Sequence, residues 1–497
     1  MTSPVPPLDK ALPSHYDLFY GGSWHRPMDE MVREIVNPGT GQGIAHVGQA
    51  TAVDVDAAVQ AAQAAFTSWR RTSGRERAGL LRQAAAVLRE HGAELALLDA
   101  LDTGNPVAET IKDAAAAAAS LDYYAGLTPM LRGETLPGPE SADEYLHYTV
   151  REPCGVVARI VASNHPLMFA GAKLAAPLAA GNTVIVKPPD QAPLAALRLA
   201  ELLGDIFPRG VVNFLPGGPD CGRALTTHAG VAVVTLIGSV PTAKAIQRAA
   251  SHTLKPTLLE LGGKNALIGF PDAHLDTLVD GVARGMNFTW AGQSCGSLSR
   301  VFLHESLHDE VLARVVQLVA QRYRPGDPTD AATTMGALID RAAQDRVRDH
   351  IASAQAEGAQ LVCGGADLPA GLDPRLAGGF FVAPTIFANV QPHMRIAQDE
   401  IFGPVMAVFR WRDEADMLRT VNSTAYGLTT AIFTRDLVTT QRAIRAIDAG
   451  FVWVNTVGKH FQNVPFGGMK ESGLGREEGL EELLAFTVTK SVNISLV

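Results

Sequence analysis

The stretch "NTVIVKP" (182–188) is a short β-branched run, and the helical text "PLAALRLAELLGDI" (193–206) follows it after four residues. The same order of strand and helix recurs in "GVVARIVA" with "PLMFAGAKLAAPLAAG", in "VVNFLPGG" with "DCGRALTTH", and in "VAVVTLIGS" with "PTAKAIQRAAS". Consecutive units of this kind predict a parallel, doubly wound sheet. Ligands bind beyond the carboxyl ends of the strands in such sheets. We therefore expect functional residues just after these strands, at Asn164, Lys187, Gly217 and Gly238.

The segments on either side of this region predict further parts of an α/β protein. Ala-rich text upstream predicts helices over 51–69 and 75–101, and "DAAAAAAS" (113–120) also reads as a buried or half-buried helix. The Pro- and Gly-rich stretch at 131–145 predicts an excursion away from the core. Beyond Glu260 a second α/β set predicts a second domain, with strands in "RVFLHE", "LVCGG", "FFVAPTIF", "VMAVFRW", "TTAIFT" and "GFVWVN".

Length, charge and cysteine usage limit the class of protein. A chain of 497 residues is too long for one ordinary core, so two or three domains are expected. The net charge of -9 argues against nucleic acid as a partner. No apolar run is long enough to predict a membrane span, and no signal layout is evident at the start. The four cysteines form no C-x-x-C pair, so we expect no metal site and a reduced, cytoplasmic setting.

The stretch "GQSCG" (292–296) contains two candidate nucleophiles. As a G-x-S-x-G motif it predicts the nucleophile elbow of a serine hydrolase, with Ser294 as the nucleophile. The alternative is that the next residue, Cys295, is the nucleophile. An elbow needs a strand, a tight turn and then a helix. Here helical text precedes the motif and strand-like text follows it, which is the reverse order. A lone cysteine can also be purely structural, so the motif alone leaves the role of Cys295 open.

Three loops after the predicted strands are candidate cofactor contacts. Gly217 lies in "LPGGPDCG", a loosened dinucleotide fingerprint, and Gly238 with Ser239 opens a helix whose free N–H groups could face a phosphate. Lys187 ends a strand before two prolines, where it could reach a ligand hydroxyl or phosphate. Ordinary β–α turns and a solvated surface lysine are the alternatives for these residues.

Several long motifs occur in a fixed order along nearly the whole chain. They are "LAAGNTVIVKP" (178–188), "LELGGKNA" (259–266), "GQSC" with a following arginine, "EIFGPV" (400–405), "AYGLTTAIFT", "GFVWVN" and "PFGGMKESGLGRE" (465–477). In this order the chain resembles the aldehyde dehydrogenase superfamily.

The resemblance implies a catalytic mechanism and an architecture. Cys295 would attack an aldehyde, Asn164 with the Cys295 backbone N–H would stabilise the oxyanion, and Glu260 would activate the water that hydrolyses the thioester. The implied fold is a Rossmann-type cofactor domain, a second α/β catalytic domain and a small β bridging arm. The corresponding segments are 1–134 and 154–260, then 261–463, and finally 135–153 with 464–497.

The resemblance also implies a cofactor and an oligomeric enzyme. NAD is expected, with NADP as an alternative, and the arm would build a homodimer or homotetramer. The residues implied to hold the cofactor are Lys187, Asp190, Gly217, Gly238, Ser239, Glu400 and Phe402. Asp190 stands where NAD-preferring relatives often carry Glu, and its charge would repel a 2′-phosphate.

The resemblance places a set of mostly apolar and small residues around the substrate. They are His165, Phe169, Ala172, Trp290, Ser294, Gly296, His460 and Phe466. With no Arg or Lys among these positions, the expected substrate is a bulky or aromatic aldehyde. The closest rival is a dehydrogenase that passes its acyl group to coenzyme A, but Glu260 favours hydrolysis. A protein that kept the fold and lost the activity is the third reading, and the presence of Asn164, Glu260 and Cys295 together disfavours it.

Overall fold

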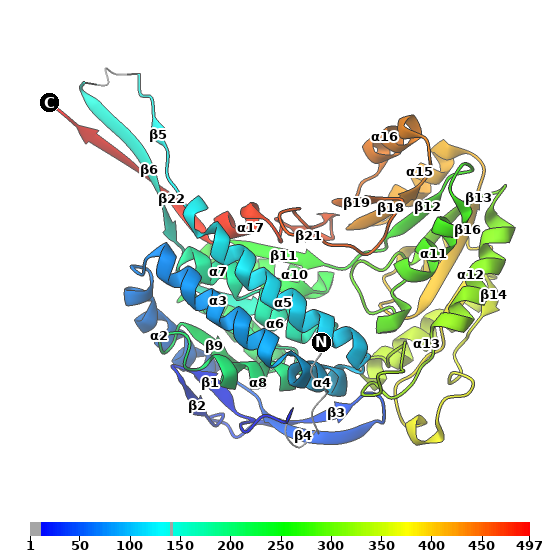
Figure 1. The fold of residues 1–497 in the computed structure, drawn as a ribbon, viewed down its shortest axis with the longest axis horizontal. Helices are drawn as coiled ribbons and strands as arrows, with labels where there is room; N and C mark the ends of the chain where they lie inside the picture. Colours follow the sequence, from blue (N-terminus) through cyan, green and yellow to red (C-terminus); the bar gives the residue numbers. More distant parts are fainter. Residues whose placement is uncertain (1–10, 140–142) are drawn as a thin grey trace.

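The computed structural model describes residues 11–139 and 143–497 and has two α/β lobes and a projecting arm (Figure 1). One lobe is built around an eight-stranded sheet and the other around a seven-stranded sheet. The α/β class and the parallel sheets predicted from the sequence are confirmed. Among the described residues, no helix combines the length and apolar character that crossing a membrane requires.

The eight-stranded sheet contains the four predicted strand–helix units. Its order is β2 (Ser23–His25), β1 (Leu18–Tyr20), β9 (Val212–Phe214), β8 (Thr183–Lys187), β7 (Val156–Ile160), β10 (Val231–Gly238), β11 (Thr257–Leu261) and β21 (Gly473–Leu474). The strands from β9 to β11 run parallel. The chain goes from β7 outward to β9 and then returns to the other side of β7 with β10. The order therefore reverses between β7 and β10, which is where doubly wound sheets bind ligands.

Helices cover both faces of this sheet (Figure 1). The helices upstream of it are α2 (Ala52–Trp69), α3 (Gly74–Glu90), α4 (Gly92–Thr103) and α5 (Val107–Leu127). Those within it are α6 (Pro166–Ala172), α7 (Ala175–Ala180), α8 (Leu194–Leu203), α9 (Pro219–Thr227) and α10 (Val240–Ala250). The helical stretch predicted over 75–101 is two helices, because His91 leaves the helical conformation between α3 and α4.

The helical text after β7 also divides, at Lys173, into α6 and α7. Pro177 has no N–H, so it cannot bond the carbonyl of Lys173 four residues earlier. The Arg159 Nε donates to that carbonyl instead, at 2.8 Å. The break thus places Lys173 beside the end of β7 and close to the centre of the molecule.

The seven-stranded sheet forms the second lobe, with order β14 (Gln360–Cys363), β15 (Thr385–Ala388), β16 (Val405–Trp411), β13 (Arg300–His304), β12 (Ala266–Gly269), β18 (Thr429–Phe433) and β19 (Phe451–Val454). All of its pairings are parallel except that of β14 with β15. Its helices are α11 (Leu275–Gly285), α12 (His308–Arg322), α13 (Arg341–Ala356), α14 (Arg395–Gln398), α15 (Glu414–Asn422) and α16 (Leu437–Ala446). Each strand predicted after Glu260 is present here.

A local hairpin, a pair of short strands from distant segments and a three-stranded arm complete the fold. The hairpin of β3 (Val32–Asn37) and β4 (Gln42–Gly48) lies below the first lobe, and β17 (Tyr426–Gly427) pairs with β20 (Met469–Lys470) (Figure 1). The arm consists of β5 (Thr135–Leu136), β6 (Tyr145–Pro153) and β22 (Thr487–Ser495), and α17 (Leu480–Ala485) precedes β22. Of the predicted excursion at 131–145, β5 forms an edge of this three-stranded sheet and Tyr145 begins β6, while residues 140–142 lie outside the described residues. The domain boundaries given above stay a prediction.

Candidate functional site

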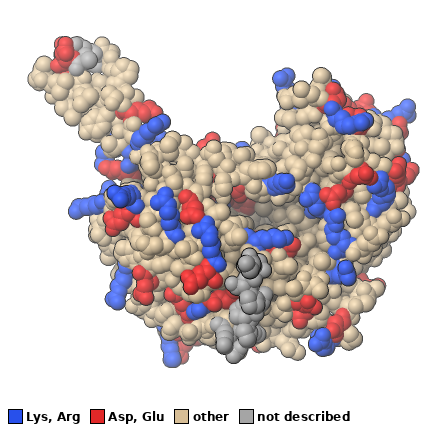
Figure 2. Space-filling view, viewed as in Figure 1, with Lys and Arg blue, Asp and Glu red and all other residues tan. Residues whose placement is uncertain are grey.

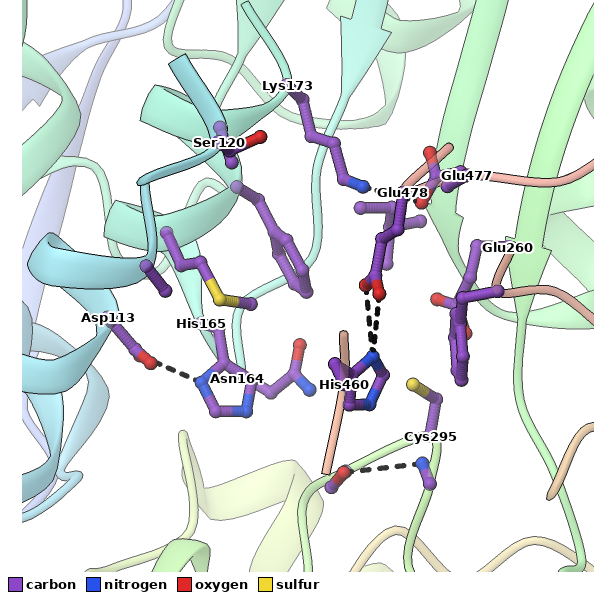
Figure 3. A pocket seen from close by; sticks show the side chains of 18 of the residues that line it. Asp113, Ser120, Asn164, His165, Lys173, Glu260, Cys295, His460, Glu477 and Glu478 are labelled. Atoms are coloured by element: carbon purple, nitrogen blue, oxygen red, sulfur yellow. Dashed lines mark hydrogen bonds and ion pairs between the residues drawn. The ribbon is translucent and has the colours of Figure 1, made fainter. Parts of the chain in front are cut away.

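A cavity of about 380 Å³ contains the three candidate catalytic residues (Figure 3). Asn164 comes from the loop after β7, Glu260 from β11, and Cys295 from the loop before β13. The cavity thus brings together residues from both lobes that are far apart in the sequence. Its volume is within the range of small-molecule sites.

The conformation of the loop that carries Cys295 depends on Gly292. The predicted order is confirmed: α11 and a short 3₁₀ turn (Phe288–Trp290) precede the loop, and β13 follows it. Gly292 has a φ of +71°, and a Cβ there would lie 2.1 Å from the carbonyl oxygen of Gly403. Only glycine fits such a position. The Cys295 carbonyl accepts a hydrogen bond of 2.6 Å from the Asn265 side chain, which holds the backbone beside the cavity.

The Glu260 carboxyl is buried against the Cys295 thiol. The Glu260 residue is 4% exposed, and its Oε1 atom has no hydrogen-bond partner among the described residues. Burial raises the pKa of the Glu260 carboxyl to about 8, and a hydrogen bond with the Cys295 thiol partly opposes the rise. A carboxyl with this pKa can accept and return protons near neutral pH.

The Cys295 thiol is harder to ionise than a free thiol. Burial raises the pKa of the Cys295 thiol well above its ordinary value, and the charge of Glu260 and its hydrogen bond add to the rise. No motif in the sequence indicated this shift. Thiolate formation in this site therefore depends on a base that takes the proton, and Glu260 is in contact with the thiol.

Asn164 is held in place through its backbone. Its carbonyl accepts a hydrogen bond of 2.8 Å from the Asn105 side chain, and the residue is buried. The Asn164 side-chain oxygen has no partner among the described residues, so the amide is not committed to a structural hydrogen bond. In Figure 3 the amide projects into the same cavity as Cys295.

A buried ion cluster that sequence reasoning missed lies beside Glu260. Lys173 Nζ is 2.8 Å from Glu477, and Arg159 is 2.7 Å from Glu482. Burial opposes the charge on Lys173, but Glu477 and Glu482 outweigh burial and raise its pKa. Burial likewise opposes the charge on Glu482, yet Lys173 and Arg159 lower its pKa to about 2.

The sequence did contain a signal for this cluster. Lys173 is the single charge in the apolar run that became α6 and α7, and Glu477 ends the last quoted motif. Buried lysines need partners. Lys173 and Glu477 both line the cavity, and their charges act on the pKa of Glu260 in opposite directions.

All eight predicted pocket residues line this cavity. They are His165, Phe169, Ala172, Trp290, Ser294, Gly296, His460 and Phe466. The cavity wall also includes residues that the sequence did not point to, among them Lys112, Asp113, Tyr124, Trp453, Phe461 and Glu478. The wall is thus more strongly charged than the eight predicted positions indicate.

The residues expected to hold a cofactor lie outside the cavity lining. Lys187 is 6% exposed, burial lowers its pKa, and its Nζ donates to the Pro188 carbonyl at 3.1 Å. No other partner of this ammonium group is found among the described residues, although it has three donors. Ser239 caps the N-terminus of α10, and its hydroxyl accepts from the Thr242 N–H. Gly217 has a packing role of its own, because a Cβ there would lie 2.5 Å from Cys221.

The other candidate cofactor contacts come from the second lobe and from the loop after β8. The Glu400 carboxylate accepts from the Gly263 N–H at 3.1 Å, and burial raises its pKa to about 7. Phe402 adopts a φ of +51°, which is unusual for a bulky residue. Asp190 forms an ion pair with Arg33 of β3, a partner that the sequence did not reveal. A buried ammonium with free donors, a capped helix end and a carboxylate fit a cofactor with ribose hydroxyls and phosphates. No group of His, Cys, Asp and Glu side chains suitable for a metal ion is found in 11–139 and 143–497.

Comparison with known proteins agrees with this geometry. The family model described as "Aldehyde dehydrogenase family" matches residues 24–492. The chain belongs to the aldehyde dehydrogenase family. It is therefore an enzyme of the aldehyde dehydrogenase type, and the helix–loop–strand order around Ser294 does not fit a serine-hydrolase elbow.

Individual relatives are similar over their whole length. Aldehyde dehydrogenase tropH of Talaromyces stipitatus is 62% identical over 496 residues, which cover 100% of this chain and 96% of the relative. The NAD⁺ complex of an aldehyde dehydrogenase from Bacillus cereus has a TM-score of 0.94 at 36% identity, with both chains covered completely. An NADP-dependent enzyme from E. coli has a TM-score of 0.93 at 32% identity, with 98% of this chain and 99% of that chain covered.

Proposed function

We propose that this aldehyde dehydrogenase oxidises an aldehyde to the carboxylic acid with NAD and hydrolyses its thioester with water. The observation that carries the proposal is the buried Glu260 carboxyl, which has a pKa of about 8 and lies against the Cys295 thiol. The Glu260 carboxyl is thus close enough to take the proton of the Cys295 thiol. The same group can later activate water at the thioester.

The first step is the attack of Cys295 on the aldehyde carbon. Glu260, when ionised, takes the thiol proton, because the raised pKa of Cys295 leaves little thiolate without a base. The sulfur then forms a bond to the carbonyl carbon, and the oxygen becomes an oxyanion in a thiohemiacetal. The Asn164 amide and the Cys295 backbone N–H stabilise that charge. In other enzymes the loss of one such donor costs about 3 kcal/mol.

The second step forms and hydrolyses a thioester on Cys295. When bound, NAD supplies the acceptor for the hydride that leaves the thiohemiacetal carbon. Glu260 releases to solvent the proton that it took from the thiol and then removes a proton from water, which attacks the thioester carbon. The carbon–sulfur bond breaks, the acid leaves, and Glu260 returns its proton to the Cys295 sulfur. A coenzyme-A-dependent enzyme would have no need of a base here, so Glu260 favours hydrolysis over transfer to a thiol.

The cofactor is NAD, with NADP as an alternative. A Bacillus cereus relative binds NAD⁺ and an E. coli relative is NADP-dependent, so the family uses both. Lys187 and Asp190 would hold the adenosine ribose, Ser239 with the end of α10 would face the pyrophosphate, and Glu400 with Phe402 would hold the other ribose. Arg33 pairs with Asp190 and reduces the repulsion of a 2′-phosphate, so the preference for NAD should be modest.

The substrate is a bulky or aromatic aldehyde. The cavity of about 380 Å³ has aromatic residues in its wall, namely Phe169, Trp290 and Phe466, and it leaves room near small Ala172. Apolar burial contributes roughly 25 cal/mol per Å² of buried surface. A small aldehyde would leave most of this surface without a partner.

The arm supports a homodimer or homotetramer. It projects from the body, and charged side chains are sparse along it between its base and tip, whereas both signs mix over the rest of this face (Figure 2). Exposed apolar residues of the arm strands are Leu136, Tyr145, Leu146, Val488 and Ile494. Such a surface favours pairing with another subunit. The four free cysteines favour a cytoplasmic location.

The test is an assay of purified protein with NAD and a panel of aldehydes, followed at the NADH absorbance band. Activity that is independent of coenzyme A and yields the free acid supports the proposal. A requirement for coenzyme A and an acyl-thiol product would instead establish the acylating alternative. Cys295→Ala is the control for NADH formed without the enzyme's nucleophile.

A further inference from the structure

Two histidines that line the cavity are each paired with a carboxylate. His165 Nδ1 lies 2.8 Å from an oxygen of Asp113, and His460 Nδ1 lies 3.0 Å from one of Glu478 (Figure 3). A carboxylate accepts, so Nδ1 carries the proton in both rings. The Nε2 atoms have no hydrogen-bond partner among the described residues, and in the neutral rings they are acceptors.

Neighbouring rings contact both imidazoles; the His165 side chain is 14% exposed and the His460 side chain 41%. The His165 ring lies 5.1 Å from the Trp290 ring and 5.9 Å from the Phe169 ring, measured between centroids. The His460 ring lies 4.5 Å from Phe466. His165 comes from the first lobe, just before α6, and His460 follows β19 of the second lobe. The cavity therefore has a preoriented imidazole from each lobe.

The charges around the cavity select the kind of group that these imidazoles bind. The acidic residues in its wall are Asp113, Glu260, Glu477, Glu478 and Glu482, and the basic ones are Lys112 and Lys173. Both lysines are engaged, Lys112 with Glu109 and Lys173 with Glu477. Even with Glu260 largely protonated near neutral pH, four acidic residues remain against two lysines, so a substrate carboxylate would meet an excess of negative charge. A neutral hydroxyl would instead donate its proton to an acceptor nitrogen.

Taking the proposed aldehyde oxidation as given, we propose that the substrate is an aromatic aldehyde that carries at least one ring hydroxyl. The hydroxyl donates a hydrogen bond to the Nε2 atom of His165 or His460, while the carbonyl lies at Cys295. Aromatic side chains pack against the ring. Asp113 and Glu478 act as positioning residues, because they hold each imidazole in the tautomer that accepts. A site built to bind a hydroxyl discriminates against analogues that lack it.

The test compares matched aldehydes that differ only in a hydroxyl or a methyl group, which are similar in size. We would measure kcat/KM for meta- and para-hydroxybenzaldehyde and for the two methylbenzaldehydes, in the wild type and in His165→Leu and His460→Leu. For at least one ring position, one of the two variants should lower the ratio of kcat/KM for the hydroxyl aldehyde to kcat/KM for the methyl aldehyde by about tenfold. Most of this change should be an increase in KM for the hydroxyl aldehyde. Electronic effects of the substituents cancel, because the same two aldehydes are compared in each protein.

A histidine outside the cavity is the matched control. His228 Nε2 lies 3.0 Å from Asp56, so His228→Leu also removes a carboxylate-paired imidazole. Its hydroxyl-to-methyl ratio should equal that of the wild type. Equal ratios in wild type, His165→Leu and His460→Leu would overturn the proposal, as would an equal fall in His228→Leu.

A binding measurement separates this proposal from the proposed function. Calorimetric titration of Cys295→Ala with the same aldehydes reports the hydroxyl preference without any turnover. If no aldehyde, including benzaldehyde, yields NADH with the wild type, the proposed oxidation fails, and titration still decides the hydroxyl preference. If benzaldehyde is oxidised but hydroxyl and methyl analogues bind alike, only the hydroxyl proposal fails.

Discussion

Glu260→Gln removes the base of the proposed hydrolysis and keeps the shape of the side chain. With a pKa of about 8, Glu260 in the wild type is ionised in about one molecule in ten at pH 7. Only this fraction can accept a proton from water. The rate of thioester hydrolysis should therefore increase about tenfold for each unit by which the pH is raised toward 8, and it should level off above pH 8.

The glutamine variant should lose this pH dependence and nearly all of the hydrolysis. General-base catalysis contributes about 10²–10⁴-fold in enzymes, and a loss of this size is expected for deacylation. Because the Cys295 thiol also loses its base, the first turnover should slow, and the variant should release at most one equivalent of NADH and then stall as an acyl-enzyme. The measurements are a rapid-mixing trace at the NADH band and the intact mass of the protein after mixing.

The matched control is Glu481→Gln, an exposed glutamate of α17, which should behave like the wild type. A glutamine variant with no NADH burst and no added mass on Cys295 would show that Glu260 acts first on the thiol. A glutamine variant with wild-type turnover and pH dependence would refute the assignment of Glu260 as the base altogether.

Four further predictions follow from the site and its surroundings. Cys295→Ala should abolish NADH formation while Ser294→Ala keeps much of it, and the reverse pattern in the same assay would contradict the nucleophile assignment. NAD should be favoured over NADP through Asp190. Arg33→Gln frees the Asp190 charge, so it should raise kcat/KM for NAD relative to kcat/KM for NADP by about fivefold. Equal kcat/KM with both cofactors in the wild type would count against this. Benzaldehyde and hexanal should be better substrates than acetaldehyde or succinic semialdehyde, and a tenfold advantage of either small aldehyde, about 1.4 kcal/mol, would disprove the expected pocket. Arg159→Met leaves the buried Glu482 carboxylate without its ion-pair partner, so urea denaturation should show a loss of about 3 kcal/mol in the free energy of unfolding, and an unchanged midpoint would contradict it.

The order of strands and helices was predictable because it depends on local patterns. A β-branched run such as 183–187 can be recognised from its own residues, and the structure has β8 there. Helix ends were less predictable. The break at Lys173 depends on Arg159, which approaches from another strand and bonds the free carbonyl. The sequence around Lys173 contains Pro177, which leaves the Lys173 carbonyl free, but it does not contain Arg159, which donates to that carbonyl.

The ion pairs of the site were out of reach for the same reason. Asp113 lies in an Ala-rich helix that reads as featureless, yet α5 places it against His165. Arg33 and Asp190 are separated by most of the first lobe in sequence. Contacts of this kind form between elements whose relative placement only the packed sheets establish.

The sequence by itself determined the α/β class, the order of the elements and the identity of Cys295, Glu260 and Asn164 as candidates. These depend on the periodicity of side chains and on motifs that are contiguous along the chain. The tertiary structure alone decided how these groups behave as acids and bases. The raised pKa values of Glu260 and Cys295 arise from burial and from each other's proximity, and the two residues come from different lobes. It also decided that two imidazoles meet two carboxylates around one cavity, because that arrangement exists only when the two sheets are brought together.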